Sequence, residues 1–533
     1  MQMEENMKRI LTNFFIILSF FSFLSITPTF AKDPNTLVVA VTGEIESLDV
    51  MQLAAPRAWS VAWAVYGNAM EWGKTEKDGL EYVTYDFRPG LIESWSHEMV
   101  GDALVYTLKV RKGCKFHSGN ELTAADFVYR TERMQALRPW NNTVWGLNTG
   151  HEGYEVIDDY TFKVTIDAPN PISHIGMSQM TMMIPDSAEM KANHTSDDPW
   201  AEQFIRTKDL GIGAYRIERS VPGVETVLVK NEGYCAPDYM QAKFDKILVK
   251  IIPDLAQQVQ LLRSGDVDLA PELPAKELMD LLGDSDISVL SFDSMTLMGL
   301  GLNSNVEPFN NKKVRQALAH ATPSADIIDA VYMGKGQAAS SLITRGTIGA
   351  LEDIWPYNYD LDKAKSLLNE AGYANGFDMD LVFNLSASTH ADSAIFIKDS
   401  FGKIGVNVNL KAESPAAFQE KLRKKEQPAF MYEMLSWTND AGYSYDMIFS
   451  PWGFANYTNY DSSVVNDAIK NNWSVMDDDV RYPMYHDAQR SLDADVQTIV
   501  ITQPHRMIAL RSGLGGYSKY FDEMPRYHEM YRK

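Results

Sequence analysis

Short apolar and alternating runs mark the strands that we predict along the chain. Thr36–Val41 is rich in β-branched residues, and Val105–Val110 alternates apolar with polar positions. Both patterns are typical of β-strands, because side chains on a strand point to opposite faces in turn. Further strands are predicted at Tyr160–Ile166, Val224–Lys230 and Ile247–Ile252.

Helical periodicity is present between these runs. Leu255, Val259 and Leu262 recur at helical spacing, and Gly265 ends that pattern. Asp360 is placed to cap a helix that Gly372 would terminate in a left-handed conformation. Other predicted helices are Phe127–Leu137, preceded by a capping-box pattern at Thr123 to Asp126, and Val314–Ala321, Glu413–Leu422 and Val480–Leu492. The chain therefore mixes α and β structure, and the absence of long Pro/Ser linkers favours lobes joined by a short ordered hinge.

The first 31 residues have the pattern of a secretory signal peptide. Lys8 and Arg9 precede an apolar run from Ile10 to Ile26, and Thr29-Phe30-Ala31 offers small residues at a cleavage site. A membrane anchor is the alternative, but the run is shorter than the roughly 20 residues that a span needs. We expect cleavage after about Ala31 and export of the remaining 533 − 31 = 502 residues, with no stable membrane anchor.

Size and charge narrow the possible functions. A chain of 533 residues exceeds the roughly 250–300 residues at which a single core stops growing, so two or three subdomains are expected. Lys and Arg number 49 against 71 Asp and Glu, which gives a formal charge of −22. Such a surface repels phosphate backbones, so no nucleic-acid partner is expected.

The two cysteines, Cys114 and Cys235, leave two possibilities open. An exported protein can form a disulfide, but a chain of this size does not need one. Two unpaired, buried thiols are the favoured interpretation, and the sequence does not decide whether the sulfurs meet.

Motifs of catalysis and cofactor binding are missing from the sequence. It contains no G-x-S-x-G elbow, no H-E-x-x-H and no P-loop. The ten histidines are scattered, and His151, His174 and His505 have no Asp, Glu or Cys at metal-ligand spacing. We therefore expect no enzyme activity, no cofactor and no metal. An exported hydrolase stays the alternative from another class, since a pair of carboxylates leaves no motif.

Several segments, taken in order, resemble one family of binding proteins. The most specific segment is Tyr106–Arg133, YTLKVRKGCKFHSGNELTAADFVYRTER. Gly211–Asn231, Phe244–Ala270, Leu300–Val331 and Asp360–Asp378 follow in the same order. Together they resemble the extracellular solute-binding proteins of family 5, the dipeptide, oligopeptide and nickel class of ABC importer, over nearly the whole mature chain.

The resemblance implies an α/β periplasmic-binding-protein fold with two lobes, a hinge and an extra N-terminal subdomain in lobe I. Lobe I would comprise 32–298, with the subdomain inserted at about 61–205, and lobe II would comprise 299–496. Residues 497–533 would return into lobe I. The hinge is expected near Ser291–Leu300 and Gln497–Gln503.

The same resemblance implies a ligand site. Trp437 and Asp440 have the W-x-x-D spacing that peptide-binding members place at the cleft. Asp440 would then pair with a peptide α-ammonium beside the wall formed by Trp437, because an unpaired buried charge is costly. The alternative is a turn residue, since Asn439-Asp440-Ala441-Gly442 is a good turn sequence.

Other candidates follow from their positions relative to the family pattern. Pro56–Trp59 follows the first predicted strand, and the equivalent region lines pockets in relatives. The remaining candidate ligand residues are Trp140, Trp145, Gln503, His505, Arg345, Trp452 and Asn456. Core packing is the alternative for the two tryptophans at 140 and 145, and surface exposure is the alternative for Arg345.

The predicted function is capture of a peptide-like or other amine-bearing solute in the periplasm and delivery to an ABC permease of the inner membrane. We expect a monomer. The same fold binding an oligosaccharide or opine is the first alternative, because 11 Trp and 25 Tyr suit sugar stacking as well as peptide side chains.

Overall fold

The computed structural model describes residues 33–53, 55–77, 79–137, 153–167, 171, 183–436 and 438–533. The signal-peptide prediction and the predictions for Trp140, Trp145 and Trp437 fall outside these residues. Among the residues described, every helix is too short or too polar to span a bilayer.

A mixed sheet of twelve strands forms the centre of the described structure. Its main path runs β16-β15-β17-β13-β18-β11-β1-β10-β9-β8. On one side of β18 lie the strands that we group as lobe I, namely β1 (Thr36–Val41), β8 (Tyr215–Val221), β9 (Glu225–Lys230), β10 (Lys246–Ile251) and β11 (Leu269–Ala270). On the other side lie those of lobe II, namely β13 (Thr296–Leu302), β15 (Phe377–Asn384), β16 (Val406–Glu413) and β17 (Ala429–Leu435).

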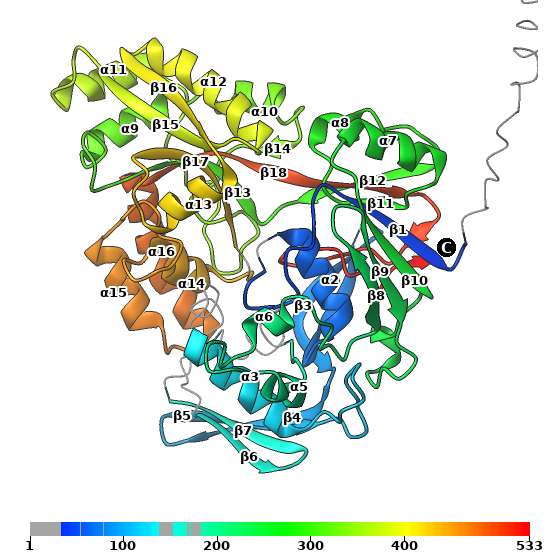
Figure 1. Ribbon diagram of the computed structural model, residues 1–533. Coiled ribbons are helices and arrows are strands. Elements are labelled where there is room, and N and C mark those ends of the chain that lie inside the picture. Colours follow the sequence, from blue (N-terminus) through cyan, green and yellow to red (C-terminus); the bar gives the residue numbers. More distant parts are fainter. Residues whose placement is uncertain are drawn as a thin grey trace, which may run out of the picture.

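One long strand, β18 (Thr498–Arg511), runs through both lobes. Its first residues pair with β13, with Val500 opposite Gly299, and its later residues pair with β12 (Ile287–Asp293). Figure 1 shows β18 crossing from one group of strands to the other. The chain therefore crosses between the lobes at β12–β13 and at β18, the two segments where the hinge is predicted.

Lobe II contains parallel strands joined by helices. β15 pairs in parallel with both β16 and β17, and the connection from β15 to β16 passes through α12 (Ser388–Gly402). This βαβ arrangement brings the carboxyl ends of β15 and β17 to one edge of the sheet. The other helical elements after β13 are α9 (Lys312–His320), α10 (Ser324–Ala330), α11 (Leu361–Glu370), α13 (Pro415–Arg423), α14 (Ala441–Ser444), η5 (Tyr445–Phe449), α15 (Ser463–Asn472) and α16 (Asp478–Asp495).

A smaller sheet lies apart from the central one, below it in Figure 1. Its strands, in the order β4-β5-β7-β6, are β4 (Ile92–Val100), β5 (Ala103–Val110), β7 (Thr161–Ile166) and β6 (Tyr154–Asp158). Helix α3 (Ala124–Leu137) packs on it, and the rings of Phe127 and Phe162 stack with centroids 4.9 Å apart. At the opposite side of α3, Arg133 forms a fully buried bidentate pair with Asp49 at 2.8 and 2.6 Å.

A further sheet, several helices and a few short strands complete the described structure. A three-stranded sheet joins β2 (Met70–Lys77) and β3 (Leu80–Pro89) to the C-terminal strand β20 (Ser518–Lys519). The helices are α2 (Pro56–Tyr66), α5 (Ser187–Ala192), α6 (Glu202–Ile205), α7 (Leu255–Ser264) and α8 (Ala275–Met279). The last short strands are β14 (Gly336–Gln337), β19 (Leu514–Gly515) and β21 (Tyr531–Arg532).

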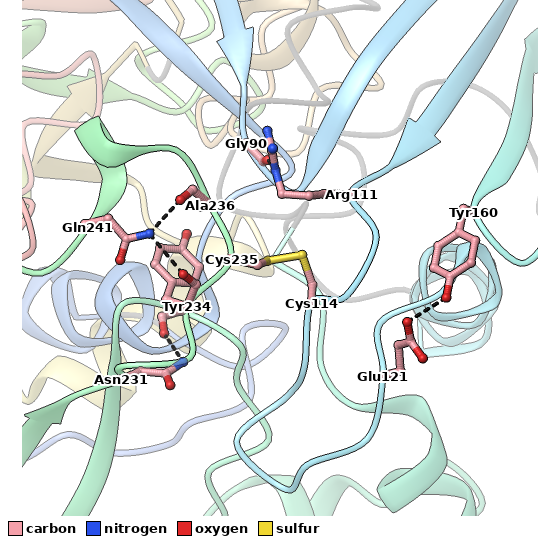
Figure 2. The surroundings of a disulfide bond; sticks show 11 residues. Gly90, Arg111, Cys114, Glu121, Tyr160, Asn231, Tyr234, Cys235, Ala236 and Gln241 are labelled. Atoms are coloured by element: carbon pink, nitrogen blue, oxygen red, sulfur yellow. Dashed lines mark hydrogen bonds between the residues drawn. A yellow bond between two sulfur atoms is a disulfide. The ribbon is translucent and has the colours of Figure 1, made fainter.

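A disulfide corrects the interpretation of the cysteines as unpaired. Cys114, on the loop after β5, is bonded to Cys235, with Cα atoms 5.2 Å apart (Figure 2). The two cysteines are 121 positions apart, so no local pattern in the sequence indicates that they meet. The loop that holds Cys235 is fixed by Gln241, whose amide donates to the carbonyls of Tyr234 and Ala236. The bond therefore fastens the smaller sheet's connecting loop to lobe I.

Candidate ligand-binding cleft

A cavity of about 490 Å³ opens between the two lobes. Lobe I contributes Pro56 at the start of α2, Arg506 on β18 and the C-terminal stretch Asp522–Met524. Thr296 lines the cavity at the start of β13, and the lobe II lining is Asn384, Ala387, His390, Phe418, Gln419, Leu422, Tyr432, Glu433, Leu435 and Tyr457. Asn384 and Leu435 are the last residues of parallel strands β15 and β17, and the carboxyl ends of such strands are where ligands bind in α/β sheets.

Glu433 places a carboxylate in this cavity. It lies on β17, whose neighbours Tyr432 and Met434 are buried, whereas the Glu433 side chain is 53% exposed to the cavity. Nε2 of His390 lies 3.9 Å from its Oε1, and its oxygens make no hydrogen bond to any residue described. Loss of bulk water around the enclosed carboxyl raises its pKa, and the nearby Arg506 opposes this shift.

His390, on the first turn of α12, contributes no charge to the cleft. The residue is only 6% exposed, and neither ring nitrogen has a hydrogen-bond partner among the described residues. Burial lowers the pKa of His390 to about 4, because the charged form would lose its hydration. At neutral pH the ring is therefore uncharged and does not neutralise Glu433.

The lobe I wall holds one arginine and two carboxylates. Nη2 of Arg506 donates to the carbonyl of Pro271 at 2.9 Å, while its Nε has no partner within the described part of the chain. Asp522 is engaged by Arg526 at 3.1 and 2.7 Å. Glu523 accepts a hydrogen bond from the backbone N–H of Met295, and burial raises its pKa. With Asp522 neutralised, the cleft has two carboxyl groups facing a single arginine.

An apolar pocket of about 190 Å³ adjoins the cleft. It shares Tyr432, Glu433, Leu435 and Tyr457 with the larger cavity. Its other walls are Met434, Tyr443, Met447, Ile448, Phe454 and Ala455. Glu433 thus stands where the polar cleft meets an apolar recess.

Asp440, the carboxylate predicted to meet the ligand, is engaged by protein groups. Nη1 and Nη2 of Arg481 donate to its two oxygens at 3.1 and 2.7 Å, and the Tyr482 hydroxyl donates at 3.0 Å. The residue is 5% exposed and also caps α14 through the N–H of Tyr443. Burial alone would lower the pKa of Arg481. The hydrogen bonds to Asp440 and the attraction of that carboxylate outweigh the effect of burial and raise the pKa of Arg481.

Glycine at position 442 allows this close packing. An added Cβ would lie 3.0 Å from Oδ1 of Asp440 and 3.2 Å from Nη1 of Arg481. The Asn439–Gly442 segment leads into α14 with Asp440 as its N-cap, and the ligand role of Asp440 stays a prediction.

Three other predicted residues contact the hinge or the surface. The amide of Gln503 donates to the carbonyls of Ser294 and Arg345 and accepts from the Arg345 N–H. His505 lies 3.4 Å from Asp293, and the Arg345 guanidinium pairs with Glu352 and Asp353. None of the three is among the residues described as lining the cleft.

Trp452 and Asn456 also lie outside the lining described above. Trp452 is 49% exposed and donates its indole N–H to Asp446 at 2.7 Å. The Asn456 amide is buried and donates to the carbonyls of Ser450 and Tyr460. The ligand roles proposed from the sequence for these residues remain predictions.

Sequence reasoning missed Glu433, His390 and Arg506. A usable signal did exist for Glu433, since it is the single charged residue of the otherwise apolar or aromatic run Ala429–Leu435. An acid at the centre of such a strand requires either a partner or a solvent-filled space. His390 and Arg506 carried no comparable local signal. Pro56, in the region singled out after the first strand, does reach the cavity.

Comparison with known proteins identifies the family. Residues 86–456 match the model of the bacterial extracellular solute-binding proteins, family 5 (middle region). This match covers more than half of the chain, so the chain belongs to that family. It is a solute-binding protein of the class that serves ABC importers.

Individual relatives agree with this assignment. The chain is 27% identical over 379 residues to heme-binding protein A of Haemophilus influenzae, covering 67% of each chain. It is 24% identical over 467 residues to the dipeptide-binding protein of Escherichia coli, covering 81% of this chain and 84% of the relative.

Solved structures share the two-lobed fold. The periplasmic binding protein DppA of Helicobacter pylori, in complex with the peptide STSA, superposes with a TM-score of 0.81 at 24% identity, covering 93% of this chain and 98% of that one. The dipeptide-binding protein of Pseudoalteromonas sp. SM9913, in complex with Met-Leu, also gives 0.81, at 19% identity with 93% and 100% covered. These likenesses confirm the predicted fold class.

Proposed function

We propose that this protein captures a peptide-like or other amine-bearing solute and delivers it unchanged to a membrane permease. The observation that carries the proposal is the cavity between the lobes, where Glu433 and Glu523 face a single arginine, Arg506. A surplus of negative charge favours a ligand that brings at least one cationic group. The relatives named above as dipeptide-binding proteins support the same class of ligand.

Closure of the lobes provides the mechanism of capture. A ligand shifts a two-state equilibrium only through contacts that differ between the states. A solute in this cavity would contact α12, α13 and β17 of lobe II together with Arg506 and Met524 of lobe I. Contacts to both walls would favour the closed form, which a permease can distinguish from the open form.

The cellular setting follows from the predicted signal peptide. We propose cleavage after about Ala31, residence in the periplasm as a monomer, and a permease of an ABC importer as the partner. Division into lobe I (32–298), with a subdomain at about 61–205, lobe II (299–496) and a C-terminal return (497–533) completes the proposal. No step of the proposed function alters the ligand, so the protein would not act as an enzyme.

An opine is the second candidate ligand. A structural neighbour, AgaA of A. tumefaciens R10 in complex with agropinic acid, has a TM-score of 0.78 at 23% identity and covers 93% of this chain. The arginine in the cleft could bind a carboxylate of such a ligand, just as it could bind the C-terminus of a peptide.

Ligand identification tests the proposal directly. The mature protein is purified from cells, and small molecules released by denaturation are identified by mass spectrometry. The emptied protein is then heated with a panel of dipeptides, tripeptides, opines and oligosaccharides. A ligand at 100 times its dissociation constant adds about 2.7 kcal/mol to the free energy of unfolding and raises the Tm measurably.

The expected result is stabilisation by di- or tripeptides and recovery of intact ligand after long incubation. Stabilisation by opines or sugars alone would favour the alternative ligands. Turnover of a bound solute would favour the hydrolase hypothesis. Asp440→Asn in the same panel tests the sequence-based ligand role: unchanged affinity across all peptides would reject it.

A further inference from the structure

Two carboxylates, Glu433 on β17 and Asp440 at the start of α14, differ in the protein groups that already bind them. Both oxygens of Asp440 accept hydrogen bonds from Arg481, and one also accepts from Tyr482. The Glu433 carboxylate, by contrast, makes no hydrogen bond in the described structure and faces the cleft. A cation entering the cleft would have to displace Arg481 to reach Asp440, whereas nothing described competes for Glu433.

We propose that Glu433 binds the ammonium group of the ligand and that the adjoining apolar pocket binds the side chain next to that ammonium. This inference rests on the proposed function and specifies its ligand: an α-ammonium compound with an apolar group on the neighbouring carbon.

The charges around Glu433 support this assignment. The Glu433 side chain is 53% exposed to the cleft and makes no hydrogen bond in the described structure, so a ligand ammonium that displaces water from it would supply charge and hydrogen-bond donors together. His390 cannot do so, because it is 94% buried by area, has no partner for either nitrogen among the residues described, and lies 3.9 Å away. Arg506 is held on the opposite wall by the Pro271 carbonyl, with its Nε left for a ligand acceptor.

The apolar pocket supports the second half of the proposal. Met447, Ile448 and Phe454 line it, and Glu433 belongs to both its wall and the cleft wall. A group bonded to the same carbon as the ammonium would therefore enter the recess when the ammonium meets Glu433. With a volume of about 190 Å³, the recess accepts a branched or aromatic side chain and gives glycine nothing to fill it.

Binding of three defined probes to the mature protein, emptied of endogenous ligand, tests the proposal by titration calorimetry. The probes are Leu-Gly, Gly-Gly and N-acetyl-Leu-Gly. Wild type should bind Leu-Gly more tightly than Gly-Gly, and acetylation should abolish binding because it removes the ammonium. Glu433→Gln should weaken Leu-Gly binding at least about 30-fold, because the bound ligand would cover the Glu433 carboxylate and removing one charge of a covered pair costs about 2 kcal/mol or more.

Two further variants serve as controls. Glu370→Gln removes an exposed carboxylate of α11 that pairs with Lys313 at 3.0 Å. This variant should bind Leu-Gly as wild type does. Ala455→Leu fills the pocket and should weaken Leu-Gly binding more than Gly-Gly binding, which reduces the preference for Leu-Gly. The Tm of each variant reports folding, and Glu433→Gln should keep the wild-type Tm because it preserves the shape of the side chain.

The outcomes separate the two levels of the proposal. If wild type binds Leu-Gly and Glu433→Gln binds it equally well, the Glu433 assignment is overturned while the peptide function stands. Loss of binding in Asp440→Asn alone, with the wild-type Tm retained, would return the ammonium to Asp440. If wild type binds none of the probes, the proposed function itself fails. If Glu433→Gln does not fold, two other measurements still test the inference. Equal binding of Leu-Gly and N-acetyl-Leu-Gly by wild type would overturn it. An unchanged preference of Ala455→Leu for Leu-Gly over Gly-Gly would overturn it as well.

Discussion

Arg481 on α16 engages both carboxylate oxygens of Asp440, at 3.1 and 2.7 Å. The pair joins the start of α14 to the first turns of α16, and both residues are almost completely buried. A buried pair of this kind is costly to assemble but more costly to break, because the remaining charge keeps its desolvation penalty. Asp440 therefore has a structural role that does not depend on any ligand.

The first prediction concerns this pair. Arg481→Met should lower the free energy of unfolding by about 3–5 kcal/mol, because Asp440 would be left buried without its main partner. Adding Asp440→Asn to that variant should recover part of the loss. Urea unfolding followed by circular dichroism measures both effects.

A matched control lies on the same helix. Arg490 is exposed and pairs with the exposed Asp487 at 3.0 Å, so Arg490→Met should change stability by less than about 1 kcal/mol. Equal losses of unfolding free energy in Arg481→Met and Arg490→Met would contradict the prediction, because the buried pair would then stabilise the fold no more than the exposed pair.

The second prediction concerns the disulfide between Cys114 and Cys235. Its removal in Cys114→Ser/Cys235→Ser should lower the free energy of unfolding by about 2–4 kcal/mol, because the unfolded chain regains the freedom of a loop that spans 121 residues. Reducing agent should destabilise the wild type to a similar extent and leave the double variant unaffected. A wild-type unfolding curve that reducing agent does not move would contradict the prediction.

Much of the secondary structure was predictable because its signals are local. Thr36–Val41 forms β1 with those bounds, and Asp254 and Asp360 cap α7 and α11 through the N–H groups of Gln257 and Lys363. Gly265 adopts the left-handed conformation that ends α7. Each of these features depends on residues within a few positions of one another, so a single sequence contains the information.

The cleft was less predictable because it depends on contacts between distant segments. Glu433 and Arg506 are 73 positions apart and line the same cavity only because β18 returns to lobe I. Residue type alone is ambiguous: Gln503 and Arg345 are plausible ligand residues, and in the structure their polar atoms bind protein groups of the hinge and of neighbouring loops. Which polar atoms are already satisfied is a property of the fold that no local pattern reveals.

The third prediction is a pH dependence at Asp493, near the end of α16. One oxygen accepts hydrogen bonds from the Leu342 N–H and the Ser341 hydroxyl, and the other has no partner in the described residues. Burial raises the pKa of Asp493 to about 7, against the opposing effect of these hydrogen bonds. Its unfolded pKa is about 3.9, so the folded state retains a proton that the unfolded state loses between these values.

The stabilisation from this proton is complete below about pH 4 and is lost as the pH rises to about 7. Asp493→Asn keeps an acceptor oxygen and cannot titrate. The free energy of unfolding of the variant minus that of wild type should therefore increase from pH 4 to pH 7 and stay level above. Denaturant unfolding at pH 4.5, 6, 7 and 8.5 measures this difference, and a constant difference would show that Asp493 does not titrate in this range.

The fourth prediction separates hinge support from ligand contact at Gln503. Its amide joins the carbonyl of Ser294, in the first crossing between the lobes, to both backbone groups of Arg345. Gln503→Ala should leave these buried groups unpaired and lower the free energy of unfolding by about 1–3 kcal/mol. Because the amide points at protein groups, affinity for Leu-Gly, corrected for the fraction folded, should change by less than about threefold. Calorimetry together with urea unfolding measures both quantities, and a large loss of affinity without loss of stability would instead support the ligand role predicted from the sequence.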